Sequence, residues 1–251
     1  MAMLTILRHG KSLWNKEKRF TGWTDVTLSN SGITEAKQAG RLLKARGLTF
    51  DICFTSYLNR AIETLEIVLD TMKLSHTPIH KDWRLNERHY GELQGLKWWE
   101  ATKKYGAKQV LAWQRDFDAP PPPLALVDPR FPGNDPLYTH LESTGLPQSE
   151  SLKDTLARLL PFWHDIAIPE LQRGKNVLIV AHHNSLRGLM KHLDNISDAD
   201  IANIRIRTAD PILYQLNEIM APISRESLRP RSTFSRLSQK ILSRWLQRIS
   251  G

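Results

Sequence analysis

The chain has 251 residues, of which 41% are hydrophobic and 24% charged, and its net charge is +9. A chain of this length can bury a core without disulfides, and its single cysteine, Cys53, excludes an internal disulfide framework. No apolar run reaches the ~18 residues of a membrane span and no signal peptide is evident, so we expect a cytoplasmic protein. The positive charge leaves nucleic acid, an anionic membrane surface or small anions as candidate partners.

Predicted strands alternate with predicted helices along the chain. Short apolar runs predict strands, and apolar residues at helical spacing predict helices. In chain order these are a strand over Leu4–Leu7, a helix over Ile33–Arg46, a strand over Asp51–Thr55, a helix over Leu58–Leu74, a helix from Ser151 through Leu160 with a kink at Pro161, a strand over Val177–Ala181, a helix over Ser185–Leu193 and a strand over Ile212–Leu216. This order predicts an α/β fold of three layers, with a mainly parallel central sheet and helices on both faces.

A proline-rich segment interrupts this alternation. More than half of the 14 prolines lie between Asp118 and Pro147, including the run Pro120–Pro123. Because predicted strands continue beyond it, the segment is an insertion within one domain that covers residues 1–222. Long loops in compact domains are commonly lids or binding loops, so we expect residues 118–148 to form a lid, with a stiff spacer as the alternative.

Histidines and arginines follow the predicted strand ends. Arg8 and His9 follow the first strand, Arg60 begins the helix after the second, and His182 and Asn184 follow the third. Ligands bind at the carboxyl ends of strands in open α/β sheets, so we expect these side chains to converge. Imidazole can attack phosphorus and guanidinium matches phosphate oxygens, which predicts phosphoryl transfer. No spacing typical of a metal site accompanies these strand ends, so no metal is expected.

Longer motifs around these residues resemble the histidine phosphatase superfamily, and most closely its 2,3-bisphosphoglycerate-dependent phosphoglycerate mutases. The matching blocks follow that family's order and spacing over roughly residues 4–216. They are Arg8-His9-Gly10 with Ser12 and Trp14-Asn15, then Phe20-Thr21-Gly22-Trp23, Arg60-Ala61, the run from Arg84 to Gly91, the proline run, the run from Glu150 to Asp154, and the run from Asn184 to Gly188.

The resemblance implies a phosphoglycerate mutase-like fold and the interconversion of 3-phosphoglycerate and 2-phosphoglycerate through a phosphohistidine. His9 would be the nucleophile, primed by 2,3-bisphosphoglycerate, and no metal would take part. Glu87 would exchange a proton with the substrate hydroxyl, while Arg8, Arg60 and His182 would stabilise the phosphoryl group. The implied substrate-binding residues are Ser12, Asn15, Thr21, Gly22, Arg88, Tyr90, Arg115 and Asn184. A homo-oligomer is a further expectation from the family.

Several positions depart from the mutase pattern, and most of them affect the part of the site that would hold the far end of the substrate. Lysine replaces a glutamate at Lys11, two expected cations are replaced at Trp98 and Gln114, and glycines are replaced at His183 and in Ala209-Asp210. Three interpretations follow: a mutase in which Lys11 and Lys97 restore the charge, a phosphatase for another small phosphorylated metabolite, or a non-catalytic metabolite-binding protein. The persistence of the mutase blocks favours the first.

The last segment, residues 223–251, is predicted as a basic amphipathic tail. It holds +6 of the net charge through Arg225, Arg229, Arg231, Arg236, Lys240, Arg244 and Arg248, against Glu226. From Phe234 onward, apolar residues at helical spacing predict an amphipathic helix. We favour docking on the protein itself or on a second subunit over an anionic membrane surface. Because residues 1–222 carry only +3, no nucleic-acid partner is expected.

Overall fold

The computed structural model describes residues 2–141 and 145–229. Its centre is a six-stranded sheet in the order β3-β2-β4-β1-β5-β6. The strands are β1 (Ala2–Arg8), β2 (Ile52–Thr55), β3 (Ile79–Lys81), β4 (Val177–Ala181), β5 (Ile212–Leu216) and β6 (Pro222–Ser227). The neighbours among β3, β2, β4 and β1 pair in parallel, whereas β5 pairs antiparallel with both β1 and β6. The predicted mainly parallel α/β fold is confirmed.

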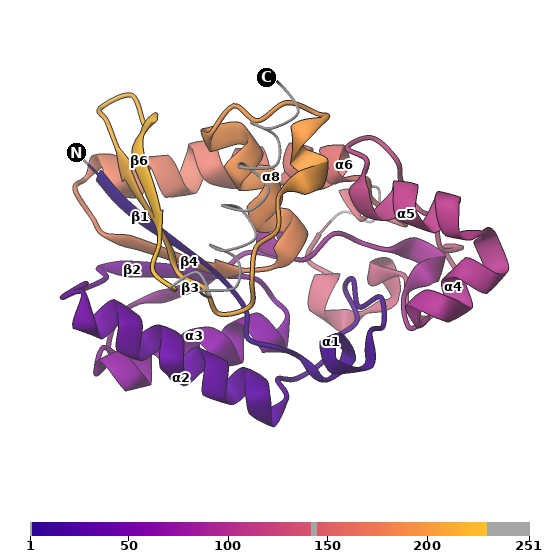
Figure 1. Cartoon of the computed structure of the whole chain (residues 1–251), viewed down its shortest axis with the longest axis horizontal. Helices are drawn as coiled ribbons and strands as arrows, with labels where there is room; N and C mark the ends of the chain where they lie inside the picture. The colour runs from indigo at the N-terminus through magenta and orange to yellow at the C-terminus, as the bar shows by residue number, and fades with distance from the viewer. Residues whose placement is uncertain (1, 142–144, 230–251) are drawn as a thin grey trace, which may run out of the picture.

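Helices cover both faces of the sheet (Figure 1). The α-helices are α1 (Leu13–Glu17), α2 (Asn30–Ala45), α3 (Asn59–Met72), α4 (Trp98–Tyr105), α5 (Ala107–Arg115), α6 (Leu152–Phe162), α7 (Ile168–Gln172) and α8 (His183–Leu193). Short 3₁₀ turns cover Trp83–Leu85, Gly91–Leu93, Pro132–Asn134, Pro136–Tyr138 and Asp200–Asn203, and a π-helical turn over Trp163–Ala167 joins α6 to α7.

Alternate side chains of the central strands define two hydrophobic cores. Ile6 and Ile179 face the core formed with α6, α7 and α8, whereas Leu7 and Val180 face the core formed with α2 and α3. Successive side chains of a strand point to opposite faces, so strands buried on both sides must be apolar throughout. That is why continuous apolar runs predicted β1 and β4 correctly.

The sheet extends into the segment that was predicted as a tail. β6 pairs with β5, placing Glu226 opposite Leu213 and Arg225 opposite Tyr214. The domain boundary expected after residue 222 therefore falls inside a strand. β6 was missed because it is a polar edge strand, and β3 because it has only three residues, all exposed. The predicted amphipathic helix from Phe234 lies outside the described residues.

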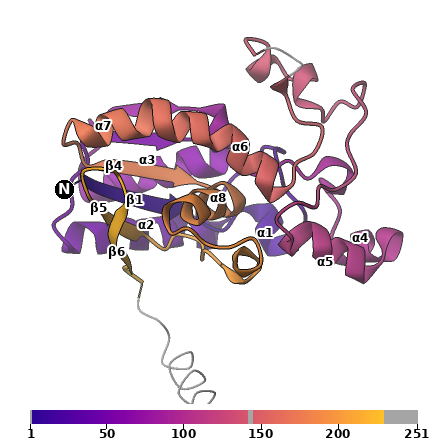
Figure 2. The ribbon, with the colours of Figure 1, turned by 90° about the horizontal axis from the view of Figure 1, so that it is seen from above.

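Two further segments pack at one end of the molecule (Figure 2). α4 and α5 form a small helical cap over Phe20 and Leu93. The proline-rich insertion contributes Phe131 and Tyr138 to a second cluster around Trp23. Both segments thus contact the loop over residues 18–23, which follows the first motif of the chain.

Candidate active site

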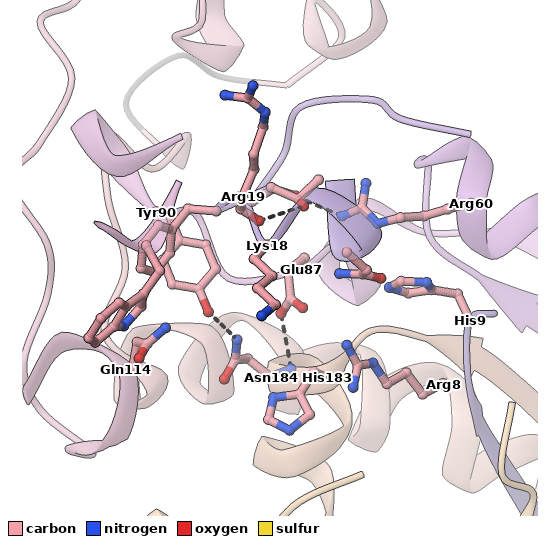
Figure 3. Close-up of a pocket in the computed structure, with 15 residues that line it drawn as sticks. Arg8, His9, Lys18, Arg19, Arg60, Glu87, Tyr90, Gln114, His183 and Asn184 are labelled. Carbon is pink, nitrogen blue, oxygen red and sulfur yellow. Dashed lines mark hydrogen bonds between the residues drawn. The ribbon is translucent and has the colours of Figure 1, made fainter. Parts of the chain in front are cut away.

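A cavity of about 540 Å³ opens at the carboxyl end of β1 and the N-terminus of α8 (Figure 3). Its walls come from segments far apart in the sequence. They are the end of β1, residues 15–22, the first turn of α3, residues 87–90, the cap helices and the start of α8. The strand-end residues of the sequence do converge, as expected for a parallel sheet.

His9 is buried with its ring orientation fixed. Its Nδ1 lies 2.7 Å from the carbonyl oxygen of Gly10, and because a carbonyl can only accept, Nδ1 must donate. Burial, followed by the charges of Arg60 and Arg8, lowers the pKa of His9 well below the ordinary histidine value. The ring is therefore neutral at pH 7, with its lone pair on Nε2, which is the form that attacks phosphorus.

The backbone around Gly10 holds the nucleophile in place. The Gly10 amide donates to Thr64 Oγ1 at 3.0 Å. A Cβ at position 10 would lie 2.4 Å from the carbonyl oxygen of Gly32 at the start of α2, a contact that only glycine avoids. The Gly in Arg8-His9-Gly10 thus allows the close approach between β1 and α2 that orients His9.

His182 lies next to His9 at the end of β4, with ring centroids 5.0 Å apart. Its Nε2 is 2.7 Å from Ser56 Oγ, whereas its buried Nδ1 has no hydrogen-bond partner among the described residues. Burial and Arg60 lower its pKa as well. His182 is absent from the cavity lining, and its contact with the site is the packing of its ring against His9.

Arg8 and Arg60 supply buried positive charge beside His9. Arg8 NH1 donates to the Ile206 carbonyl at 2.8 Å, and Arg60 donates to the carbonyls of Thr24 and Gly22 at 3.0 and 2.8 Å. Burial lowers the pKa of Arg60 to about 10, so the guanidinium stays charged at pH 7. Two anchored guanidinium groups are suited to the equatorial oxygens of a phosphoryl group.

Glu87 faces the same cavity from the opposite wall. Its Oε1 accepts the backbone N–H groups of Arg88 at 2.8 Å and Asn184 at 3.0 Å. Its own carbonyl accepts Trp23 Nε1 at 2.6 Å and an Arg158 nitrogen at 2.9 Å. The carboxyl group is thus held at the cavity by both its side chain and its backbone, in a position to exchange a proton with a bound alcohol.

The predicted substrate-binding residues fall into two groups. Those that line the cavity are Asn15, Thr21, Gly22, Tyr90 and Asn184. Ser12, Arg88 and Arg115 do not line it. Ser12 is the N-cap of α1 and hydrogen-bonds the backbone of Asn15, so it acts on the site through that residue. Arg88 is buried beneath Tyr90, and Arg115 lines a neighbouring cavity.

A family model describes almost the whole chain. The histidine phosphatase superfamily (branch 1) model matches residues 4–129 and 134–218. The chain belongs to this superfamily.

Solved structures show the same fold across the superfamily. A mycobacterial glucosyl-3-phosphoglycerate phosphatase has a TM-score of 0.68 at 23% identity, over 93% of this chain and 100% of that one. A putative α-ribazole-5′-phosphate phosphatase from Escherichia coli has a TM-score of 0.65 at 22% identity, over 87% and 92%. An α-ribazole phosphatase from Shigella flexneri has a TM-score of 0.66 at 22% identity, over 88% and 94%. These matches support the fold, and none of the three is named a mutase.

Within this histidine phosphatase fold, sequence reasoning missed Lys18, Arg19 and Phe20 as cavity residues. Lys18 ends α1 in the left-handed conformation, with φ of 58°, which turns the chain into the cavity wall. No local signal predicted this, since lysine is not typical of left-handed positions. The Arg19 guanidinium bonds Glu17 and the Gly95 carbonyl, so Lys18 is the less constrained of the two cations.

The cations expected to replace the missing ones do not face the cavity. Neither Lys11 nor Lys97 is among its described lining residues. The Lys11 amide donates to Glu35 at 3.0 Å and its ammonium group lies 4.0 Å from the same carboxylate. Trp98 and Gln114, in contrast, line the cavity directly. At Trp98 and Gln114 the cavity wall is therefore aromatic or neutral where the resemblance implies cations, and the positive charges of the lining come from Arg8, Lys18, Arg19 and Arg60.

That the proline-rich insertion forms a lid stays a prediction. None of its described residues lines the cavity. Instead, Tyr138 Oη accepts Asn86 Nδ2 at 2.9 Å, and the Tyr138 ring packs 5.0 Å from the Trp23 ring. Trp23 in turn hydrogen-bonds the Glu87 carbonyl. The insertion thus supports the wall that holds Glu87.

Over residues 2–141 and 145–229, no group of three or more metal-ligating side chains is assembled. In the same part of the chain, no helix combines the length and the apolar character needed to cross a membrane.

Proposed function

We propose that this protein is a phosphatase that removes the phosphoryl group of a small metabolite through a phosphohistidine at His9. In the first step, His9 Nε2 attacks phosphorus and the bond to the alcohol oxygen breaks. Glu87 gives its proton to the departing alcohol. In the second step, Glu87 takes a proton from water, whose oxygen attacks phosphorus, and the bond to Nε2 breaks. Inorganic phosphate leaves and His9 is regenerated.

The residues around His9 support both steps. Arg60 is buried, Arg8 is partly buried, and both are anchored by backbone carbonyls, which suits them to stabilise charge on the transferring group. His182, whose ring packs 5.0 Å from that of His9, is a further group beside the transferring phosphoryl group. No step in this scheme needs a second phosphorylated molecule.

One observation favours hydrolysis over the mutase reaction. A mutase must hold the bisphosphate intermediate while it reorients, and that needs cations far from His9. Trp98 and Gln114 occupy the positions where the resemblance implies those cations. Charged hydrogen bonds contribute roughly 1.5–3 kcal/mol each, so a glycerate phosphate would be held weakly after the first transfer. Priming by 2,3-bisphosphoglycerate fits this cavity poorly for the same reason.

The names of similar proteins point in the same direction. The mycobacterial relative is a glucosyl-3-phosphoglycerate phosphatase and the enterobacterial ones are α-ribazole phosphatases. Both kinds are named as phosphatases for small phosphorylated molecules. We therefore propose the same reaction class for this chain and take the mutase reaction as the second candidate, which the mutase-like sequence blocks favour.

A comparison of two reactions tests the proposal. Purified protein is given p-nitrophenyl phosphate, and separately 3-phosphoglycerate with catalytic 2,3-bisphosphoglycerate. We expect phosphate release from the first that is lost in His9→Ala, and little isomerisation of the second. Isomerisation faster than hydrolysis would establish the mutase instead. No turnover together with the absence of phosphohistidine by mass spectrometry would indicate a metabolite-binding protein.

A further inference from the structure

A second cavity of about 320 Å³ adjoins the catalytic one. Four residues line both cavities: Tyr90, Gln114, His183 and Asn184. Figure 3 shows Gln114, Asn184 and His183 along one side of the catalytic cavity. The second cavity adds two residues of its own, Arg115 at the end of α5 and Arg205 just after the 3₁₀ turn Asp200–Asn203. It therefore adjoins the catalytic cavity along the wall that these four residues form.

The charge around the second cavity is positive and uncompensated. No acidic residue lines it in the part of the chain that the structure describes. Arg115 and Arg205 are exposed at its rim, and Arg205 NH1 bonds only backbone carbonyls, those of Ala202 and Ile204. An arginine whose charge faces no carboxylate is free to bind an anion.

Buried arginines strengthen this field from beneath. Arg88 is fully buried, and its three guanidinium nitrogens have no hydrogen-bond partner among the described residues. It stacks 4.6 Å from the centre of the Tyr90 ring, which is part of the shared wall. Arg187, also buried, bonds the neutral acceptors Asn184 Oδ1 and the Ile201 carbonyl. Buried charges without a counter-charge are costly, so an anion bound nearby would offset part of that cost.

His183 lies between the two cavities, within reach of this charge. Burial, and after it the charges of Arg8, Arg187 and Arg205, lower its pKa well below the ordinary value. A neutral imidazole at this position separates the two cavities without repelling a cationic neighbour. The resemblance implies a glycine here, and Arg205 lies in none of the sequence blocks that carry the resemblance. The second cavity is thus a feature of this chain's own residues.

We infer that Arg205 is a specificity-determining residue: together with Arg115, which the resemblance already implies as a substrate-binding residue, it binds a carboxylate or phosphate on the alcohol part of the substrate in the second cavity. The inference rests on the proposed phosphatase function and narrows its substrate class. A phosphate monoester would place its phosphoryl group at His9 and extend past Gln114 and His183, so that its second anionic group lies between the two arginines.

Matched substrate pairs test the inference. Sorbitol 6-phosphate and 6-phosphogluconate have the same length and differ in whether the far end is an alcohol or a carboxylate. We expect wild-type full-length protein to prefer the acid in kcat/KM. Arg205→Gln should lower the ratio of acid to alcohol about 10-fold, the typical effect of one charged hydrogen bond. Arg173→Gln removes the same charge from an exposed residue between α7 and the start of β4, away from both cavities. It should leave kcat/KM for both substrates unchanged.

Erythritol 4-phosphate and erythronate 4-phosphate form a second pair with four carbons. Comparing the two pairs shows at which chain length the carboxylate reaches Arg205. The inference would be overturned if, for both pairs, the ratio of kcat/KM for the acid to kcat/KM for the alcohol were the same in wild type and Arg205→Gln.

A binding experiment separates this inference from the proposed function. If no member of either pair is hydrolysed, the phosphatase proposal fails. Isothermal titration calorimetry of 6-phosphogluconate with His9→Ala protein then measures the second cavity without turnover. Weaker binding on adding Arg205→Gln, with unchanged binding of sorbitol 6-phosphate, supports the second cavity. Equal loss for both ligands contradicts it.

Discussion

The ring of His182 lies 5.0 Å from the ring of His9 at an interplanar angle of 57°, held there by a hydrogen bond to Ser56. The two histidines come from the ends of neighbouring parallel strands, β1 and β4. Burial lowers the pKa of both rings, so both are neutral before substrate binds. A phosphoryl group at His9 would bring negative charge next to His182, which favours a protonated and donating His182.

Ser56 is therefore expected to control phosphoryl transfer without contacting the substrate. Ser56→Ala removes the hydrogen bond that positions the His182 ring. A small displacement of a group that acts in the reaction lowers the reaction rate. We expect kcat to fall about 10-fold, with slower phosphohistidine formation in rapid-quench experiments. Thr55→Val, which removes a hydroxyl bonded to the Val180 carbonyl instead, is the matched control. Equal kcat losses in the two variants would show that only general packing is disturbed.

Buried histidines also predict how stability depends on pH. Burial, followed by the charge of Arg158, lowers the pKa of His89 to about 3, whereas an unfolded histidine titrates near 6.5. Between these values the unfolded state binds the extra proton, so this contribution to stability is present above pH 6.5 and lost as the pH falls. The slope is about 1.4 kcal/mol per pH unit for one histidine.

His89→Asn should reduce that slope. Asparagine keeps an acceptor where His89 Nδ1 receives the Gly91 amide at 3.1 Å, but it cannot take up a proton. Urea unfolding between pH 6 and 4 should show a free energy of unfolding that falls less steeply than in wild type, by up to about 1.4 kcal/mol per pH unit. His76→Asn replaces an exposed histidine and should leave the slope unchanged. Parallel slopes in wild type and His89→Asn would contradict the prediction.

The sequence predicted what depends on local pattern and missed what depends on neighbours. β4 is apolar throughout and β1 is mostly apolar because both faces of each strand are buried, so their ends, with His9 and His182, could be located. β6 escaped because its residues are polar, and only pairing with β5 makes it a strand. Lys18 escaped because a left-handed lysine has no sequence signature. The resemblance implies a cation at position 114, where this chain has Gln114, and Arg205 supplies a positive charge nearby. The sequence could not predict this, because it depends on the contact in the folded protein between α5 and the 3₁₀ turn Asp200–Asn203.

The neutral far wall predicts a gain of affinity on restoring charge. The double variant Trp98→Lys, Gln114→Arg places two cations in the catalytic cavity, and each charged hydrogen bond contributes roughly 1.5–3 kcal/mol. We expect KM for 3-phosphoglycerate to fall at least about 10-fold in steady-state assays. Trp99→Lys adds a cation to the neighbouring exposed tryptophan, which does not line the cavity, and should change KM little. An unchanged KM in the double variant would mean that the substrate does not reach this wall.

Lys18 and Lys73 offer a matched pair for separating backbone strain from charge. Each ends a helix in the left-handed conformation, with φ of 58° and 64°, but only Lys18 lines the cavity. Glycine adopts this conformation without the Cβ clash that costs other residues roughly 1–2 kcal/mol. Part of this stabilisation is offset, because glycine also increases the conformational entropy of the unfolded chain. Both Lys18→Gly and Lys73→Gly should therefore raise the free energy of unfolding by up to about 1 kcal/mol in urea titrations.

Their kinetics should differ. Lys18→Gly removes a positive charge from the cavity and should raise KM for an anionic substrate about 3-fold at low salt, while Lys73→Gly should leave KM unchanged. Because Lys18 is exposed, its effect should shrink at about 1 M salt, where the Debye length is about 3 Å. An equal rise of KM in both variants would show that the backbone change causes the effect. A rise in Lys18→Gly that is the same at low and high salt would exclude a role for the Lys18 charge.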